Sequence, residues 1–170
     1  VAGLALCVAV SAQSVRPGLP PIQLPEGPLL YQTAEHPEVR VVVMTRDLSH
    51  PWAMAFLPDG RILVTERGGA LREVQDGHLS PHPIPGVPDV HTVGLAGLMD
   101  IALHPRYTEN RLVYLTYTKP GADGPRVALA RGRLGDQGLT DVEDLFLSDV
   151  VGGGGTAASR VVFAPDGTLY

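Results

Sequence analysis

The sequence predicts an all-β protein of the β-propeller class, and two observations carry that prediction. First, a phrase returns three times: an apolar triplet, one further residue, a proline, a polar turn and an apolar strand. Its prolines are Pro58, Pro105 and Pro165, so the spacings are 47 and 60 residues. Second, no segment keeps a helical period of apolar residues over three turns. Repeats of this length built from hairpins are typical of propeller blades, whereas a β-sandwich would not require the phrase to return.

The segments expected to form strands follow one another from residue 39 onward. They are rich in β-branched and other apolar residues and are separated by turn-forming residues. The pairs Asp59-Gly60 and Asp76-Gly77 are hairpin signals. The longer spacing of the repeat would hold a loop insertion around 119–124 or 148–158. The expected strand regions are 39–45, 51–67 (two strands), 69–79 (two strands), 97–105, 110–118, 125–134, 142–147 and 159–170.

The chain divides into three expected regions. Residues 1–13 resemble the end of a secretory signal peptide, because an apolar run closes in the small residues of Val10-Ser11-Ala12. That run is too short to span a membrane, and an N-terminal hydrophobic strand is the alternative. Residues 14–38 are rich in proline and read as an extended leader. Residues 39–170 are expected to be the N-terminal blades of a propeller that continues beyond this sequence, exported to the periplasm or the cell exterior.

Composition excludes some classes of partner and site. The 170 residues include 20 glycines and 16 prolines and carry a formal net charge of −5. A nucleic-acid-binding protein would need a clustered basic surface, so no nucleic-acid partner is expected. Cys7 is the only cysteine and lies within the expected signal. The mature chain would therefore hold no disulfide and no cysteine-based metal site in this part.

The stretch VGGGGTAASRVVF, residues 151–163, has the spacing of a nucleotide-binding loop. Gly152, Gly154 and Ala157 fit the pattern G-x-G-x-x-[GA]. That pattern binds a pyrophosphate only where a helix begins, so that its N-terminal amides face the anion. Here β-branched residues follow, and Pro165 closes the segment. The stretch is therefore expected to be a blade-connecting loop.

Histidines and acidic residues offer weaker candidates. His78 and His82 are four residues apart, but the prolines beside His82 prevent the helix that would align them for a metal. Asp141 and Glu143 would share one face of a strand, where a solvated edge is favoured over a calcium or acid–base pair. His91, in the loop PDVHTVGLAG, is the histidine of greatest functional interest. No metal ligands are assigned within this sequence.

The phrases LSHPWAMAFLPDGRILVTERGGALREVQDG, GLAGLMDIALHPRYTENRLVYLTYT and SRVVFAPDGTLY, in that order, are similar to those of a known family. Over residues 48–170 the chain resembles the soluble PQQ-dependent glucose/sorbosone (aldose sugar) dehydrogenases. The resemblance implies a six-bladed propeller, usually exported. It also implies oxidation of a sugar at the anomeric carbon with bound PQQ and calcium, whose ligands would lie beyond Tyr170.

The resemblance also marks departures at the residues that carry chemistry. The family's base histidine lies four residues before an arginine that matches Arg160, so its position is Thr156. A threonine hydroxyl is too weak a base near neutral pH unless another base activates it. The family's substrate-side glutamine corresponds to Leu95, which cannot hydrogen-bond a sugar. His91 is the local candidate for a relocated base.

These features leave three functions open. The first is a catalytically divergent PQQ-dependent dehydrogenase of an aldose or related alcohol, with an unassigned electron acceptor. The second is an exported propeller that binds a ligand or partner without catalysis. The third is a calcium-dependent, lactonase-like propeller enzyme. Strand and turn phrases match the family, and fold alone does not decide among the three.

Overall fold

The computed structural model describes residues 24–150, 157 and 159–170. The chain separates into two compact units, Val1–Val43 and Met44–Tyr170. In the first unit, strand β1 (Leu29–Tyr31) pairs antiparallel with β2 (Val39–Val41). Part of the segment expected to be an extended leader is therefore a small hairpin. The expected signal remnant, residues 1–13, lies outside the described residues, and the division into signal, leader and blades stays a prediction.

The second unit begins with a four-stranded antiparallel sheet, which we call blade 1. Its strands are β3 (Pro51–Phe56), β4 (Ile62–Glu66), β5 (Leu71–Gln75) and β6 (His78–Leu79), in the order β3-β4-β5-β6. Asp76 and Gly77 connect β5 to β6, both with positive φ, as a two-residue hairpin requires. The Asp59-Gly60 turn is wider, because β3 ends at Phe56 and β4 starts only at Ile62.

The next sheet, blade 2, repeats this arrangement. It consists of β7 (Leu98–Leu103), β8 (Leu112–Lys119), β9 (Arg126–Gly135) and β10 (Gly138–Val150), in the order β10-β9-β8-β7. A single helical turn, α1 (Tyr107–Asn110), connects β7 to β8. Strand β10 is longer than the expected 142–147, and its pairing with β9 shifts register at three places. Such shifts mark β-bulges, which strand periodicity does not reveal.

A third strand pair starts after blade 2, where Phe163 and Leu169 form an antiparallel bridge. The three repeated phrases make related turns, and the second is longer because it contains α1. The amide that precedes the proline donates across the turn in each: Leu57 to Arg61 at 2.8 Å, His104 to Leu112 at 3.0 Å and Ala164 to Thr168 at 2.8 Å. The repeat read from the sequence is therefore a repeat in structure.

The core lies between blades 1 and 2. Ala55, Leu57, Leu63 and Leu71 of blade 1 and its turn pack with residues of blade 2. Leu63, Leu71, Leu98 and Val113 are completely buried. Each such aliphatic side chain contributes roughly 1.5–3 kcal/mol through removal of apolar surface from water. The blade 2 members of the core are Leu98, Ile101, Val113, Leu115, Tyr117, Ala128, Ala130, Leu134 and Leu139.

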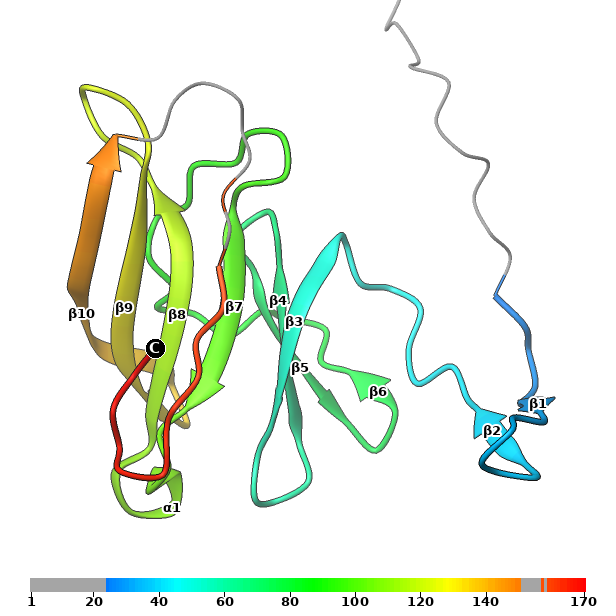
Figure 1. Ribbon diagram of the computed structural model, residues 1–170. Helices are drawn as coiled ribbons and strands as arrows, with labels where there is room; N and C mark the ends of the chain where they lie inside the picture. The colour runs from blue at the N-terminus through cyan, green and yellow to red at the C-terminus, as the bar shows by residue number, and fades with distance from the viewer. Residues whose placement is uncertain (1–23, 151–156, 158) are drawn as a thin grey trace, which may run out of the picture. The chain divides into compact units, whose positions relative to one another are not determined.

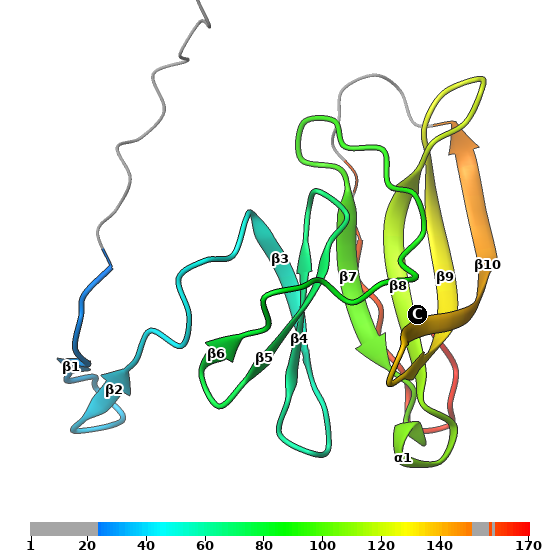
Figure 2. The same cartoon turned by 180° about the vertical axis from the view of Figure 1, so that it is seen from behind.

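Different connecting segments lie at the two ends of the blades (Figures 1 and 2). We call the end with the three repeated turns and α1 the turn end. The opposite end is the loop end, where β3, β7 and the segment from Ser159 begin. Strands β4 and β8 finish there. The candidate residues His91 and Leu95 belong to the loop that enters β7, so they lie at the loop end.

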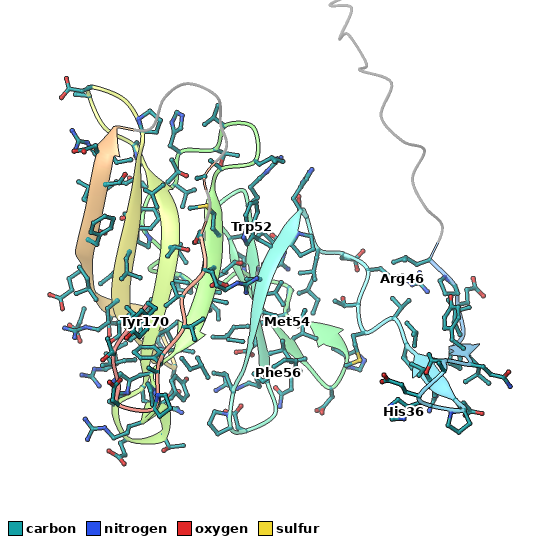
Figure 3. The ribbon with its side chains drawn as sticks, viewed as in Figure 1. His36, Arg46, Trp52, Met54, Phe56 and Tyr170 are labelled. Atoms are coloured by element: carbon teal, nitrogen blue, oxygen red, sulfur yellow. The ribbon has the colours of Figure 1, made fainter. Side chains whose placement is uncertain are left out.

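One face of strand β3 stays open. Trp52, Met54 and Phe56 alternate along β3 (Figure 3), and their exposed fractions are 38%, 60% and 67%. The alternate positions Ala53 and Ala55 pack toward the core instead. This alternation gives β3 two apolar faces, as expected for a strand that is covered on both sides. Within the described part of the chain, no helix has the length and hydropathy that a membrane crossing requires.

Candidate functional site at the loop end of the blades

The segment that enters β3 is held by a buried carboxylate. Glu66, the last residue of β4, is 5% exposed, and its Oε1 accepts the amide of Ser49 at 2.6 Å. Its Oε2 lies 3.6 Å from the guanidinium of Arg72. A carboxylate removed from water needs such partners to remain charged. Glu66 therefore fixes the backbone at Ser49, two residues before β3 begins at Pro51.

The loop that enters β7 is a tight turn fastened from both sides. Val93 and Ala96 pair as an isolated bridge, with Gly94 and Leu95 at the tip. The amide of His91 donates to the carbonyl of Thr118 at 2.7 Å. The Arg67 guanidinium donates to the carbonyl of Gly94 at 2.5 Å. The backbone of this turn is therefore set by β8 and by the residue that follows β4.

The geometry of this turn determines how far the side chains of Leu95 and His91 are exposed to solvent. Leu95 is 58% exposed at the tip, so an apolar side chain faces solvent there. The His91 ring is half-buried and has no hydrogen-bond partner among the described residues. Its backbone is fixed while its ring nitrogens remain available. The loop can offer one imidazole and no amide group at the position where the resemblance expects a glutamine.

Thr156, the position of the family's base, lies outside the described residues. The chain is described again at Ser159, whose hydroxyl contacts the hydroxyl of Thr116 on β8. Thr116 is two residues from Thr118, which holds His91. The structure thus brings the loop of His91 and the segment after Thr156 to the same part of β8. Whether Thr156 or His91 takes a catalytic role stays a prediction.

Asp100 is a residue of this end that the sequence analysis did not single out. It lies within the apolar phrase GLMDIAL on β7 and is 3% exposed. Its Oδ2 accepts the amide of Val161 at 2.7 Å, and its Oδ1 lies 3.4 Å from Nη1 of Arg160. The signal in the sequence was a charged residue inside an otherwise apolar strand. Its partners, about sixty residues later, could not be read from that signal.

Two candidate acidic residues of β10 form ion pairs. Glu143 contacts Arg131, and Asp141 lies 3.7 Å from Arg133. Both arginines project from the same face of β9, since they are two residues apart. Asp141 has a positive φ of 51° at one of the bulges of β10. These contacts fit the solvated strand edge that was favoured for this pair.

Asp144 receives two donors from β8. The Tyr117 hydroxyl donates at 2.7 Å and the Lys119 ammonium at 2.5 Å. Burial alone would raise the pKa of Asp144, but these donations outweigh it and leave the pKa below its usual value. Burial also raises the pKa of Tyr117, which stays a neutral donor near pH 7. This network ties β10 to the loop end of β8.

The described residues match a PQQ site only in part. PQQ carries carboxylates, so cations are expected around it. Arg160 is an exposed guanidinium of this end, with 78% of its side chain accessible, whereas Arg67 is partly buried and donates to the Gly94 carbonyl. Among the described residues, no group of three or more histidine, cysteine, aspartate or glutamate side chains could hold a metal ion. Arg160 could therefore contact one carboxylate of the cofactor, and no calcium ligand can be named in this part.

Comparison with known proteins gives consistent matches. The family model for glucose/sorbosone dehydrogenase matches residues 48–170. The chain is 43% identical over 145 residues to the uncharacterized protein slr1608 of Synechocystis sp., covering 80% of this chain and 35% of that protein. It is 39% identical over 137 residues to the aldose sugar dehydrogenase YliI of Escherichia coli, covering 78% and 37%. The chain thus spans a little over a third of the length of these curated relatives.

Solved structures agree. A PQQ-bound aldose sugar dehydrogenase from Streptomyces coelicolor superposes with a TM-score of 0.63 at 26% identity, covering 85% of this chain and 41% of that one. The predicted all-β propeller fold is confirmed by the two meander blades and by this neighbour. Since the family model covers most of the sequence, the chain belongs to the glucose/sorbosone dehydrogenase family.

Proposed function

We propose that the full-length protein is an exported, PQQ-dependent oxidoreductase that oxidises an aldose or a related alcohol, with a catalytic base displaced from the family position. The observation that carries the proposal is the family match over residues 48–170 together with the PQQ-bound relative. One matching relative, YliI of Escherichia coli, is an aldose sugar dehydrogenase by description, and sugars are small polar substrates. Export rests on the apolar run at residues 1–13.

The residues at the loop end suggest a role for each group in the proposed reaction. PQQ, when bound, would accept hydride from the anomeric carbon of the substrate. His91 would accept the hydroxyl proton of that substrate, because its ring nitrogens have no partner among the described residues and its backbone is fixed to Thr118. Arg160 would contact a carboxylate of the cofactor. Calcium is proposed from the family alone, with its ligands beyond Tyr170.

The decisive assay is reconstitution of the full-length protein with PQQ and calcium. Binding is followed by the shift in melting temperature, and turnover is followed by reduction of a dye acceptor across a panel of aldoses. The proposal predicts both a thermal shift and dye reduction. If PQQ causes neither, the dehydrogenase assignment is wrong.

His91→Ala tests the displaced base. A positioned general base contributes on the order of 10²–10⁴-fold to the rate, so kcat should fall by about 100-fold or more while PQQ binding is retained. His82→Ala is the matched control, since His82 is an exposed histidine of the connection that follows β6 and should leave kcat unchanged. Unchanged turnover in His91→Ala would rule out His91 as the base.

Thr156→His tests the divergence itself. If position 156 is where the family places its base, a histidine there should raise kcat for an aldose by about tenfold or more. If Thr156→His gains nothing and His91→Ala is as active as the wild type, neither position supplies the base and the displaced-base proposal is wrong.

A second candidate, an exported propeller that binds without catalysis, is favoured by one observation. Leu95 places an exposed apolar side chain where the family has a substrate-side glutamine. This alternative predicts that the full-length protein binds an apolar or mixed ligand at the loop end without dye reduction. A measurable PQQ-dependent turnover would exclude it.

A further inference from the structure

The buried carboxylate of Asp100 needs an explanation that the fold alone does not give. Asp100 lies on β7 between Met99 and Ile101, which are 0% and 5% exposed. Its side chain is itself 4% exposed. An ionised carboxylate in such surroundings is costly unless its oxygens receive donors. An apolar residue would have packed equally well at this position. The role of Asp100 is therefore inferred from the groups that donate hydrogen bonds to its carboxylate.

Those donors all belong to the segment that follows blade 2. Oδ2 accepts the Val161 amide at 2.7 Å, and Oδ1 lies 3.4 Å from the Arg160 guanidinium. The amide of Asp100 donates to the Thr116 hydroxyl at 2.9 Å, and that hydroxyl also contacts Ser159. Two neighbouring strands of blade 2 thus hold three consecutive residues of one segment.

These contacts hold the segment at one end only. In the part of the chain that the structure describes, the hydrogen bonds between 159–170 and blade 2 all involve Asp100 or Thr116. At the turn end the same segment is held by ring packing instead. Phe163 lies 5.0 Å from the Tyr114 ring and 5.6 Å from the His104 ring, centroid to centroid. Loss of Asp100 would therefore free the loop end of the segment while the turn end stays packed.

We propose that Asp100 is a positioning residue, whose carboxylate fixes the start of the third strand pair and orients the Arg160 guanidinium toward an anionic ligand at the loop end. The ligand class is a carboxylate-bearing cofactor, so this part rests on the proposed function. Arg160 suits that role because one guanidinium nitrogen is near Asp100 while 78% of the side chain remains accessible. A guanidinium has several donors, so a single buried partner leaves others for the ligand.

The test uses the full-length protein and two readouts. The first is amide hydrogen exchange of residues 159–163, compared with residues 51–66 of blade 1, without cofactor. The second is the Kd of PQQ. The variants are Asp100→Asn, which keeps the shape and removes the charge, and Arg160→Gln, which removes the exposed cation and leaves the Val161 amide as a donor to Asp100. Asp144→Asn is the matched control, since Asp144 is a carboxylate of the same blade that contacts Tyr117 and Lys119 instead.

Asp100→Asn should raise exchange at 159–163 about tenfold or more, the factor equivalent to about 1.4 kcal/mol, and leave 51–66 unchanged. It should weaken PQQ binding by a similar factor. Arg160→Gln should weaken PQQ binding with only a small loss of melting temperature, since the Val161 amide still donates to Asp100, and this result remains decisive even if Asp100→Asn does not fold. Asp144→Asn should change neither readout at this segment.

Unchanged exchange in Asp100→Asn, or an equal increase at 51–66, would overturn the positioning role. Increased local exchange with an unchanged Kd, or an unchanged Kd in Arg160→Gln, would overturn the ligand role. A wild type that does not bind PQQ would overturn the proposed function and the ligand role together. The exchange data would then still decide whether Asp100 fixes the segment, so the two failures can be told apart.

Discussion

The two ends of the blades are built in different ways. At the turn end, three separate stretches of sequence form related turns, each closed by the amide of the residue before the proline, and the middle turn is longer because it contains α1. At the loop end, the three entering segments are held differently: by the Glu66 carboxylate, by a tight turn under Arg67, and by the Asp100 carboxylate. The repeated turns specify the fold, whereas the differently held segments at the loop end can carry the residues of a functional site. This separation of scaffold and site is general among folds that host many functions.

The largest expected difference in stability is between alanine substitutions of two glycines, one at each end of the blades. A Cβ on Gly97, at the loop end, would lie 2.1 Å from the carbonyl oxygen of Arg67. Because that neighbour is backbone, Gly97→Ala should cost about 3 kcal/mol. Gly60, at the turn end, has a φ of 90° but no atom within 4 Å of an added Cβ. Gly60→Ala should therefore cost only about 1 kcal/mol from backbone strain.

Urea unfolding of the two glycine variants in the full-length protein measures this difference. Equal losses of stability would mean that the close approach at the loop end is relieved by movement of the Arg67 backbone. The contrast between a packed loop end and an open turn end would then fail.

Much of the scaffold could be predicted from sequence, and the reasons are local. Pro58, Pro105 and Pro165 mark the repeated turns because proline fixes φ and ends strand pairing. Asp76-Gly77 marks a hairpin because both residues tolerate positive φ. These signals act within a few residues of the chain. They required no knowledge of what packs against them.

The candidate site could not be predicted to the same depth, because its contacts are distant in sequence. Asp100 and Val161 are 61 residues apart, and Glu66 and Ser49 are 17 apart. Nothing in the neighbourhood of either acidic residue indicates its donor. The bulges of β10 were missed for a related reason, since a register shift depends on the partner strand β9.

A smaller difference in stability is expected between substitutions of two glutamates that each pair with an arginine. Glu66 at the loop end is buried and holds Ser49, so Glu66→Gln should destabilise the fold by about 2 kcal/mol. Glu73 pairs with Arg61 near the turn end at 2.7 Å, with 23% of its side chain exposed. Glu73→Gln should cost less than about 1 kcal/mol, as half-exposed pairs usually do. Thermal unfolding of both variants ranks them, and the reverse order would contradict a loop end held by buried charge.

The smallest effect concerns pH. The pKa of Asp144 is lower in the folded state, so this carboxyl adds stability above its unfolded pKa of about 4 and loses it as pH falls through the folded value. Asp144→Asn should therefore be less stable than the wild type near pH 7, and this difference should shrink below about pH 4. Urea midpoints across a pH series provide the measurement. A difference that stays constant down to pH 2 would show that charge at Asp144 is not what ties β10 to β8.

The most direct test of the contrast between the two ends is a map of hydrogen exchange in the full-length protein with and without PQQ. The account predicts that PQQ protects residues 44–50, 88–97 and 159–163 at the loop end. It also predicts no added protection at the repeated turns around Pro58, Pro105 and Pro165. Protection at the turns, with the loop-end segments unchanged, would contradict the assignment of chemistry to the loop end.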